Sequence, residues 1–435
     1  MNKSQKRKVK NAAKKYPKVV AAIAVILAVI IIASIVLWFV KPELYHKFLG
    51  VGDHNFDDNG VCIVCGYERT CSGEEKEIIS AELSIHFLEL GNKSAGDSVL
   101  IKCGDTEVLI DAGSEQSSAR TIKEYVDKYC KDGKLEYVIS THADSDHISA
   151  FVGTAQASIF KDYEIETFIK FDKSDKNLNT SAGNKTLYAE YLDGVEYIRN
   201  KGTNVYTASE CYDEKNGAKR QFFLDEKHTV SINILYNYFY YYTSSDENNY
   251  SVVTLLTQEL ESGDKHYLFT GDLEKEGENK LVEYYSAVPA EYRTEYNILP
   301  QVELYKAGHH GSRTSSSMAL LNVIKPKNIA VCCCCGAPEY TKINDNTFPT
   351  QEMIDNVGKF TDKIYVTTIG TGLPEKDKDG NYVSRSYEGY ASMNGNIVFY
   401  TTGGKLKLYC SNNDTILKDT EWFKGNRKWS GISTQ

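Results

Sequence analysis

Hydrophobic and polar positions alternate with a period of two in several short stretches of this chain. One of them, 135–139, predicts a strand that ends directly before a polar turn. Other stretches repeat hydrophobic residues at helical spacing, and they predict helices over 117–130, 274–285 and 315–324. Strands that alternate with helices in this way predict an α/β fold.

A continuous apolar stretch near the N-terminus differs from this pattern. Residues 19–40 are apolar or small without interruption, which is enough to cross about 30 Å of hydrocarbon as a helix. Residues 1–18 carry eight Lys or Arg and no acidic residue. Because basic flanks stay on the cytoplasmic side, we expect a basic cytoplasmic tail over 1–18, a single transmembrane helix over 19–40 and an extracellular remainder. A buried core helix is the alternative for 19–40.

The charge of the remainder limits its partners. After residue 18 the chain has 42 basic and 59 acidic residues, a formal charge of −17. Nucleic-acid-binding surfaces need clustered Lys and Arg, so this charge argues against a large face of that kind, although it leaves room for a local basic groove.

Cysteines suggest a small site in the juxtamembrane segment, 41–80. Cys62 and Cys65 have the Cys-x-x-Cys spacing, Cys71 follows, and His54 lies eight residues before Cys62. These residues predict a structural zinc knuckle over 54–71. A disulfide between two of the cysteines is the competing interpretation outside the cell.

Two further runs each have two interpretations. Cys332 to Cys335 end a strand-like stretch, so they are either strand core or partly directed toward a cleft. The aromatic run Tyr236 to Tyr242 is either a half-buried strand or a platform for sugars or bases.

The residues with the clearest chemistry follow the strand at 135–139. His142, Asp144, Asp146 and His147 place four potential metal ligands within six positions. Two carboxylates and two imidazoles at one turn would repel and desolvate one another, and a divalent cation resolves this by accepting both kinds of donor. A solvated acidic loop is the alternative.

The order His-x-Asp-x-Asp-His resembles the His-x-His-x-Asp-His signature of metallo-β-lactamase-fold hydrolases. The form with Asp in the second position is typical of the hydrolase domain of ComEC-like DNA-uptake proteins. Further stretches are similar to that family in order and spacing: 86–91, 96–101, 108–113, 248–253, 268–272, 306–312 and 394–399. The resemblance covers roughly 81–403. It implies an αββα sandwich over those residues, with a C-terminal extension over 404–435.

The resemblance also implies a site for two divalent ions, either zinc or manganese. We expect one ion to be held by His142, Asp144 and Asp272, and the second by Asp146, His147 and Asp272. His309 or His310 would supply a further neutral donor, while the other binds a phosphate oxygen or protonates the leaving group; Asp146 would also orient the attacking hydroxide.

Two residues are expected around these ligands, and one departure from the family is evident. Asp111 would fix the tautomer of His142 or His147, unless it only satisfies backbone donors in its turn. Asn248 stands where many relatives have another His, and we expect a weak ligand or water-holder. Phe348 precedes Pro349 where the family usually has His, so one ion or slow turnover is expected if that His serves the second metal.

These features predict a membrane-anchored, extracytoplasmic, metal-dependent hydrolase that acts on phosphodiesters, either nucleic acid or cell-envelope polymers. A lactonase or β-lactamase is the alternative within enzymes. A non-catalytic surface-binding protein of the same fold is the alternative from another class, and Phe348 supports it. No protein partner is predicted.

Overall fold

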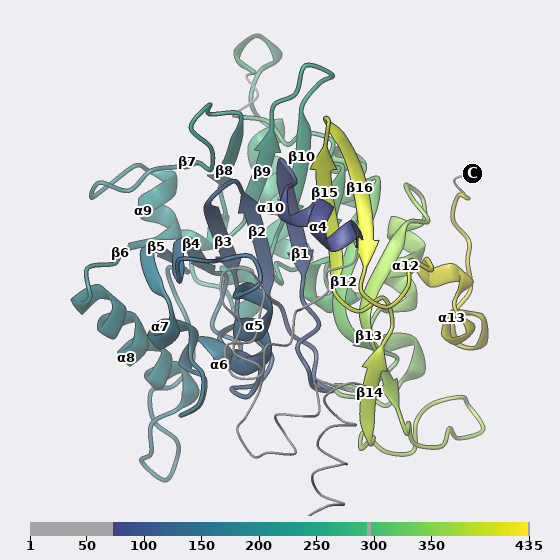
Figure 1. Ribbon diagram of the computed structural model, residues 1–435. Coiled ribbons are helices and arrows are strands. Elements are labelled where there is room, and N and C mark those ends of the chain that lie inside the picture. Colours follow the sequence, from purple (N-terminus) through teal and green to yellow (C-terminus); the bar gives the residue numbers. More distant parts are fainter. Residues whose placement is uncertain (1–72, 294–296, 434–435) are drawn as a thin grey trace, which may run out of the picture. The chain divides into compact units, whose positions relative to one another are not determined.

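The computed structural model describes residues 73–293 and 297–433 (Figure 1). The chain divides into two units, Met1–Gly73 and Glu74–Gln435, and the description that follows concerns the second. The predicted tail over 1–18, the predicted transmembrane helix over 19–40 and the predicted zinc knuckle over 54–71 lie outside the described residues. Among the residues that are described, none belongs to a helix with the length and apolar character needed to span a bilayer.

The first of two sheets has eight strands in the order β16-β15-β1-β2-β3-β4-β5-β6. Strands β3 to β6 run parallel, and the neighbouring pairs from β16 to β3 are antiparallel. The bounds are β1 Leu83–Phe87, β2 Val99–Cys103, β3 Thr106–Ile110, β4 Lys134–Ser140, β5 Glu164–Lys170, β6 Asn204–Thr207, β15 Ile397–Thr402 and β16 Lys405–Cys410.

The second sheet also has eight strands, in the order β14-β13-β12-β11-β10-β9-β8-β7. Strands β10 to β13 run parallel, and the remaining pairs are antiparallel. The bounds are β7 Gln221–Phe223, β8 Val230–Ile234, β9 Thr254–Gln258, β10 Lys265–Phe269, β11 Leu304–Lys306, β12 Asn328–Cys335, β13 Ile364–Thr371 and β14 Gly389–Ser392.

Most helices connect strands within one sheet, whereas α4 precedes β1, α9 connects the first sheet to the second, and α13 follows β16. Their bounds are α4 Gly73–Ile79, α5 Ser118–Val126, α6 Ser145–Val152, α7 Ile159–Asp162, α8 Leu187–Asn200, α9 Ala208–Tyr212, α10 Lys275–Ser286, α11 Met318–Ile324, α12 Gln351–Val357 and α13 Glu421–Asn426. Short 3-10 turns are η1 Tyr238–Tyr240, η2 Glu247–Tyr250, η3 Ala290–Tyr292, η4 Gly308–Gly311, η5 Asn344–Asn346 and η6 Leu417–Asp419.

Strand β10 shows how the layers are stacked. Its residues Tyr267 and Phe269 join the core that includes the first sheet, whereas Leu268 joins a separate core with side chains of α10, α11 and α12. The rings of Phe87 and Phe269 stack across the two sheets with centroids 6.2 Å apart. Because alternate residues of a strand face opposite sides, the two sheets pack on each other and helices cover their outer faces, which is a mixed α/β sandwich.

The three predicted helices correspond to α5, α10 and α11, with shorter or shifted ends. The strand interpretation of Tyr236 to Tyr242 is wrong, because the chain leaves the sheet after Ile234 and forms η1. The side chain of Asn237 accepts a hydrogen bond from the backbone of Phe239 (3.0 Å) and thereby caps this turn.

The chain beyond 403 is part of the same compact unit. Strand β16 pairs with β15 along its length, and Leu417, Trp422 and Phe423 are buried in the core beneath α12. The predicted boundary at 403 therefore falls inside a hairpin, and the predicted extension over 404–435 supplies an edge strand and core residues.

The four consecutive cysteines lie in β12 and all are buried. Cys332 belongs to the core between the sheets, whereas Cys333 and Cys335 belong to the helix-side core. This alternation is the strand-core arrangement of the run.

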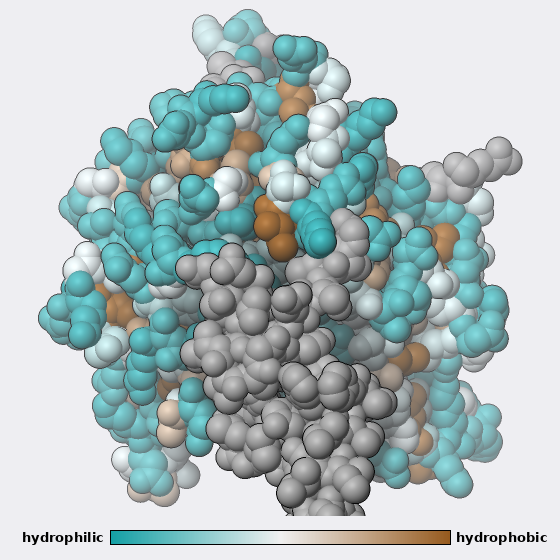
Figure 2. Space-filling view, viewed as in Figure 1, coloured by the Kyte–Doolittle hydropathy of each residue, from teal (hydrophilic) through white to brown (hydrophobic). Residues whose placement is uncertain are grey.

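The surface agrees with the composition. On the face that Figure 2 shows, hydrophilic residues predominate among those coloured and hydrophobic ones are scattered between them. A surface of this kind is usual for a charged protein domain.

Core packing generates a stability prediction. Phe168 of β5 is fully buried and contacts the rings of Phe151, Phe160 and Tyr191. We expect Phe168→Ala to reduce the free energy of unfolding by about 3–5 kcal/mol, because it removes these contacts and leaves a cavity. Urea denaturation measures the change, with Leu178→Ala, an exposed apolar position, as the control. A loss as small as that of the control would contradict this packing.

Candidate metal centre

The turn between β4 and α6 carries the predicted ligand cluster. His142 follows the carboxyl end of β4, Asp144 caps α6 with an extended backbone, and Asp146 and His147 lie in the first turn of α6. The backbone of this turn packs against Gly113, where an added Cβ would come within 1.5 Å of the carbonyl oxygen of Asp146. Glycine is therefore required there for α6 to approach the turn after β3.

Other site residues come from the equivalent ends of neighbouring strands. Asp111 follows β3, Asp272 follows β10, and His309 and His310 follow β11 in η4. The carboxyl ends of parallel strands meet at one edge of a sheet. Asp111, His309 and His310 have positive φ angles of 60°, 48° and 54°, a backbone conformation that is uncommon for residues other than glycine.

Three imidazoles converge inside this edge. His142, His147 and His310 are fully buried, and the ring centroids of His142 and His147 lie 4.1 Å apart, those of His147 and His310 5.3 Å apart. Their Nε2 atoms are buried without a hydrogen-bond partner among the described residues. Buried polar atoms normally have hydrogen-bond partners, so three such atoms in one cluster indicate a site that binds a ligand.

Carboxylates complete the donor set. Asp272 Oδ2 lies 3.1 Å from His147 Nε2 and 3.2 Å from His310 Nε2, and Asp146 Oδ2 lies 3.3 Å from His310 Nε2. Two overlapping groups bring their donor atoms within 4.8 Å of one another: His142, His147 and Asp272, and Asp146, His147 and His310. Imidazole nitrogens with carboxylate oxygens suit zinc or manganese, so the residues present fit divalent metal.

The charges of this cluster depend on one another. Burial alone would lower the pKa of His147 and of His310, but Asp272 and the neighbouring carboxylates raise both pKa values well above the ordinary value. Burial would raise the pKa of Asp272, and the charges of His147, His310 and Lys306 lower it well below the ordinary range. The carboxylates therefore need positive charge beside them, which a divalent cation also provides.

Hydrogen bonds at the other ring nitrogens fix two of these imidazoles. His147 Nδ1 lies 2.7 Å from Asp111 Oδ2, and His310 Nδ1 lies 2.8 Å from the backbone oxygen of Cys332. Asp111 also accepts hydrogen bonds from the backbone nitrogen and the hydroxyl of Thr141, both 2.7 Å. With Nδ1 held by acceptors, Nε2 is left free for a metal. Of the two histidines considered for Asp111, the structure places it on His147.

A buried lysine lies behind the cluster. Lys306 is 2 % exposed, forms an ion pair with Asp97, and lies 3.5 Å from Asp272 Oδ1. Burial would raise the pKa of Asp97, but Lys306, His310 and His147 lower it to about 2. Since Oδ1 of Asp272 faces Lys306 and Oδ2 faces the histidines, Lys306 and Asp97 position that carboxylate.

The remaining predicted residues lie at the rim. Asp144 is ion-paired with Lys176, and its Oδ2 lies 3.5 Å from His142 Nε2. His309 points away from His310: its Nδ1 lies 3.0 Å from Thr314 Oγ1 and 3.3 Å from Glu274 Oε1. Asn248 Nδ2 lies 3.5 Å from the same nitrogen of His309. The structure therefore separates the two adjacent histidines, with His310 inside the cluster and His309 outside it.

Two aromatic rings cover the side of the cluster formed by Asp146 and His310. Phe348 has its ring centroid 6.0 Å from that of His310 and 5.8 Å from that of His309. Tyr340 packs on Phe348 and donates a hydrogen bond to Asp146 Oδ2 (3.1 Å). At the position where the family resemblance implies a histidine, this chain has Phe348, whose apolar ring packs beside His309 and His310.

Sequence reasoning missed Asp97, Lys176, Lys306 and Tyr340 as site residues. Asp97 and Lys306 lie in stretches that resemble the family, next to Gly96 and shortly before Gly308. A charged residue inside an apolar strand pattern, as in Leu304-Tyr305-Lys306, is a usable signal for Lys306. Tyr340 and Lys176 lie in loops and leave no such signal.

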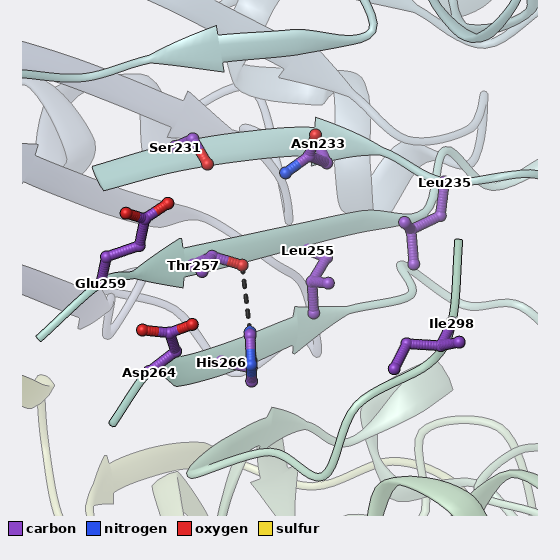
Figure 3. Close-up of a pocket in the computed structure, with 9 residues that line it drawn as sticks. All are labelled: Ser231, Asn233, Leu235, Leu255, Thr257, Glu259, Asp264, His266 and Ile298. Atoms are coloured by element: carbon purple, nitrogen blue, oxygen red, sulfur yellow. Dashed lines mark hydrogen bonds between the residues drawn. The ribbon is translucent and has the colours of Figure 1, made fainter. Parts of the chain in front are cut away.

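A separate pocket lies elsewhere in the second sheet (Figure 3). It lies on β8, β9 and β10 and is lined by side chains such as Glu259, Asp264 and His266, the last within 3.1 Å of Thr257 Oγ1. It shares no residue with the convergent groups found in the described part of the chain. The metal centre is therefore a different site.

Comparison with known proteins bears on this centre. Residues 91–173 match the sequence profile of the metallo-beta-lactamase superfamily, and this segment includes Asp97, Asp111 and the turn from His142 to His147. The similarity to that superfamily therefore extends over 91–173, which is less than half of the chain. Asp272, His309 and His310 lie outside the matched segment. No curated protein matches the chain.

Solved structures show a distant likeness to this chain. A metallo-beta-lactamase fold protein from Bacillus subtilis has 10 % identity and a TM-score of 0.34 over 65 % of this chain and 95 % of its own. A subclass B3 metallo-beta-lactamase of Bradyrhizobium japonicum has 12 % identity and a TM-score of 0.27 over 53 % of this chain and 79 % of its own.

The contact between Asp111 and His147 generates a prediction for metal binding. We expect Asp111→Asn to weaken divalent metal binding by about 10–100-fold, because the variant loses the charged acceptor that orients His147 Nδ1. Competition with a chromogenic chelator measures the affinity for zinc and manganese. Asp193→Asn, a carboxylate of α8 that pairs with Lys185, serves as the control. Unchanged affinity in Asp111→Asn would contradict the positioning role.

The buried lysine generates a second prediction, for metal-depleted protein. Lys306→Met should lower the free energy of unfolding at pH 7 by about 3–5 kcal/mol, because it removes the ammonium group that compensates the buried charges of Asp97 and Asp272. The depressed pKa of Asp97 means that its stabilising contribution is present above its unfolded value, about 3.9, and is lost as the pH falls toward 2. The deficit of the variant should therefore shrink below about pH 4.

A double variant separates this effect from lost packing. Adding Asp97→Asn to Lys306→Met removes one of the uncompensated charges, so the pair should be less destabilising than the sum of the single changes. Urea denaturation at pH 7 gives all three values. Simple additivity would show that the two side chains do not act as a pair.

Proposed function

We propose that this protein is a membrane-anchored, extracytoplasmic, metal-dependent hydrolase of phosphodiesters. The observation that carries the hydrolase proposal is the convergence of the buried Nε2 atoms of His142, His147 and His310 with carboxylate oxygens of Asp146 and Asp272. A domain of the metallo-β-lactamase superfamily supports it, since that superfamily is generally hydrolytic and metal-dependent.

The five converging residues would hold the metal. A bound divalent ion supplies Lewis acidity, which stabilises negative charge on a phosphoryl oxygen and makes water acidic enough to react near neutral pH. Asp146 also accepts a hydrogen bond from Tyr340, so one of its oxygens is fixed while the other remains for orienting water. Phe348 and Tyr340 pack beside Asp146 and His310 on that side of the site.

His309 is placed to move a proton. Its side chain is 23 % exposed, and its Nδ1 is held by Thr314 and Glu274, which leaves Nε2 unassigned at the rim. We infer that His309 protonates the leaving oxygen, whereas His310 serves as a ligand. Burial would raise the pKa of Glu274, but hydrogen bonding to His309 and Thr314 lowers it.

A groove beside the cluster favours an anionic substrate. It runs from Asp144 to Tyr188 and is lined by Lys176 and by amide and hydroxyl side chains of the loop that precedes α8. A phosphodiester would pair with the ammonium of Lys176, which now contacts Asp144. A simple lactone carries no charge for this lysine. The acidic remainder of the chain favours cell-envelope phosphodiesters over long nucleic acids.

The anchor and the location are proposed on the N-terminal sequence. The basic residues of 1–18 and the apolar residues of 19–40 support a single-pass helix with its N-terminus in the cytoplasm. The hydrolase domain would then face the outside of the cell, where envelope polymers are found.

Cleavage of an aryl phosphodiester tests the proposed reaction. We expect turnover by the purified protein with added zinc or manganese, and Asp146→Ala should reduce kcat/KM by at least about 100-fold, because it removes a ligand and the group that orients water. Asp379→Ala, an exposed loop carboxylate, is the control. Chelation followed by addition of metal should abolish and then restore the activity.

The other outcomes separate the rival functions. Stoichiometric metal binding without phosphodiester turnover would shift the assignment to a lactone or β-lactam, to be assayed next with the same variants. Absence of metal binding would indicate a non-catalytic surface-binding protein, as Phe348 suggests.

A further inference from the structure

Exposed and half-buried tyrosines gather on one surface of the second sheet and its helices. They come from the segment after β8 (Tyr236, Tyr238, Tyr241 and Tyr242), from α10 (Tyr284) and from the end of α9 (Tyr212); we call these six residues the tyrosine patch. Tyr241, Tyr242 and Tyr284 have exposed fractions of 38 %, 54 % and 40 %. Single exposed rings are common on protein surfaces, whereas rings gathered in one patch often mark an interaction site.

The rings of the tyrosine patch are ordered by contacts with one another. Tyr236 stacks on Tyr284 with centroids 3.9 Å apart, and Tyr238 stacks on Tyr242 with centroids 4.2 Å apart. The hydroxyls of Tyr212 and Tyr284 lie 2.7 Å apart. Because two pairs of rings are held in place before any ligand arrives, a ligand that stacks on them would lose little affinity to ordering the site.

The cations around the tyrosine patch already have partners. Lys280 pairs with Glu283 (3.0 Å), Lys215 pairs with Asp213 (2.8 Å), and the guanidinium of Arg220 lies 4.2 Å from the ring centre of Tyr212. Tyr241 donates a hydrogen bond to Asp213. Asp213 and Glu283 balance the charges of these lysines, so the tyrosine patch offers little net attraction to a polyanion, and this favours a ligand without dense negative charge.

Carbohydrate has the chemistry that such a surface would recognise. Sugar rings present apolar C–H faces that pack on aromatic faces, and hydroxyl edges that hydrogen-bond to phenol groups. A tyrosine offers both, an apolar body and a polar tip. The stacked rings of the tyrosine patch, with hydroxyls at their edges, match this combination.

Helix α10 connects the tyrosine patch to the metal centre. Its cap, Glu274, contacts His309, and Tyr284 lies ten residues further along, which is about 15 Å at 1.5 Å per residue. The other contributing segment continues through η2 to Asn248, also beside His309. This span is longer than a single sugar, so one ligand reaches both places only if it is an extended chain.

We propose that the tyrosine patch binds a carbohydrate segment of the polymer whose phosphodiester is cleaved at the metal centre. This assignment rests on the proposed function for its connection to catalysis. It narrows the substrate class from phosphodiesters in general to a sugar-containing envelope polymer.

Binding of defined oligosaccharides tests the assignment without any cleavage. The probes are hexamers of β-1,4-linked N-acetylglucosamine, β-1,4-linked glucose and α-1,6-linked glucose, titrated calorimetrically into the full-length Asp146→Ala protein. We expect saturable binding of at least one hexamer. In that background, Tyr242→Ala with Tyr284→Ala should weaken it by at least about tenfold, as loss of aromatic stacking predicts.

Matched variants separate stacking from folding. Tyr197→Ala removes an α8 tyrosine with a similar exposed fraction, 42 %, and should bind as the parent does. Tyr242→Phe with Tyr284→Phe keeps both rings and should retain most of the affinity. If the double alanine variant does not fold, Tyr242→Ala alone, at the more exposed loop position, should still weaken binding.

Two results would overturn the proposal. One is absence of binding to all three hexamers, or binding that the alanine variants leave unchanged. The other is tyrosine-dependent binding of a twelve-residue deoxythymidine strand with none of the hexamers, which would assign the surface to nucleic acid. Because these titrations need no turnover, they stand apart from the aryl phosphodiester assay, and either proposal can fail while the other holds.

Discussion

Three carboxylates, Asp97, Asp111 and Asp272, are almost completely buried where the carboxyl ends of strands from both sheets meet. Burying charges at such a density is unfavourable unless positive charge lies beside them. Lys306 supplies one fixed charge, and the imidazoles of His147 and His310 take protons when no metal is present. The arrangement of strands, turns and helices around this edge keeps these groups within reach of one another. The charge balance of the centre therefore depends on the topology of the fold.

The sequence predicts those residues of the centre that lie close together along the chain, and it predicts less well those that meet only in the folded structure. Asp146 and His147 share a turn with His142, so their clustering is evident from residues that are close in the sequence. Asp272 and His310 were predicted because the Gly-Asp and Gly-His-His stretches resemble the family. Asp97 and Lys306 were missed because each makes sense only beside the other, and they meet through the packing of two sheets. The choice between His309 and His310 also depended on tertiary structure, since adjacent residues in η4 point to different surroundings.

The two departures in the fold have the same origin. The run from Tyr236 to Tyr242 has strand composition and was expected to form a half-buried strand. Instead, Asn237 caps a 3-10 turn and the chain leaves the sheet, so that Phe239 and Tyr240 are buried while Tyr241 and Tyr242 are exposed. The hairpin of β15 and β16 crosses the expected domain end at 403, because an edge strand and the burial of Trp422 and Phe423 are decided by distant partners. The composition of these segments shows that they are rich in aromatic residues. It does not show which distant residues they contact in the folded protein.

The donors of the metal centre are divided between the two sheets. His142, Asp146 and His147 follow β4 of the first sheet, whereas Asp272 and His310 follow β10 and β11 of the second. An ion held by both groups would therefore cross-link the two layers, in addition to the apolar packing of rings such as Phe87 and Phe269. Binding of the ion would therefore stiffen the interface between the two sheets and also prepare the site for catalysis. The catalytic activity and the rigidity of the sheet interface would then increase or decrease together.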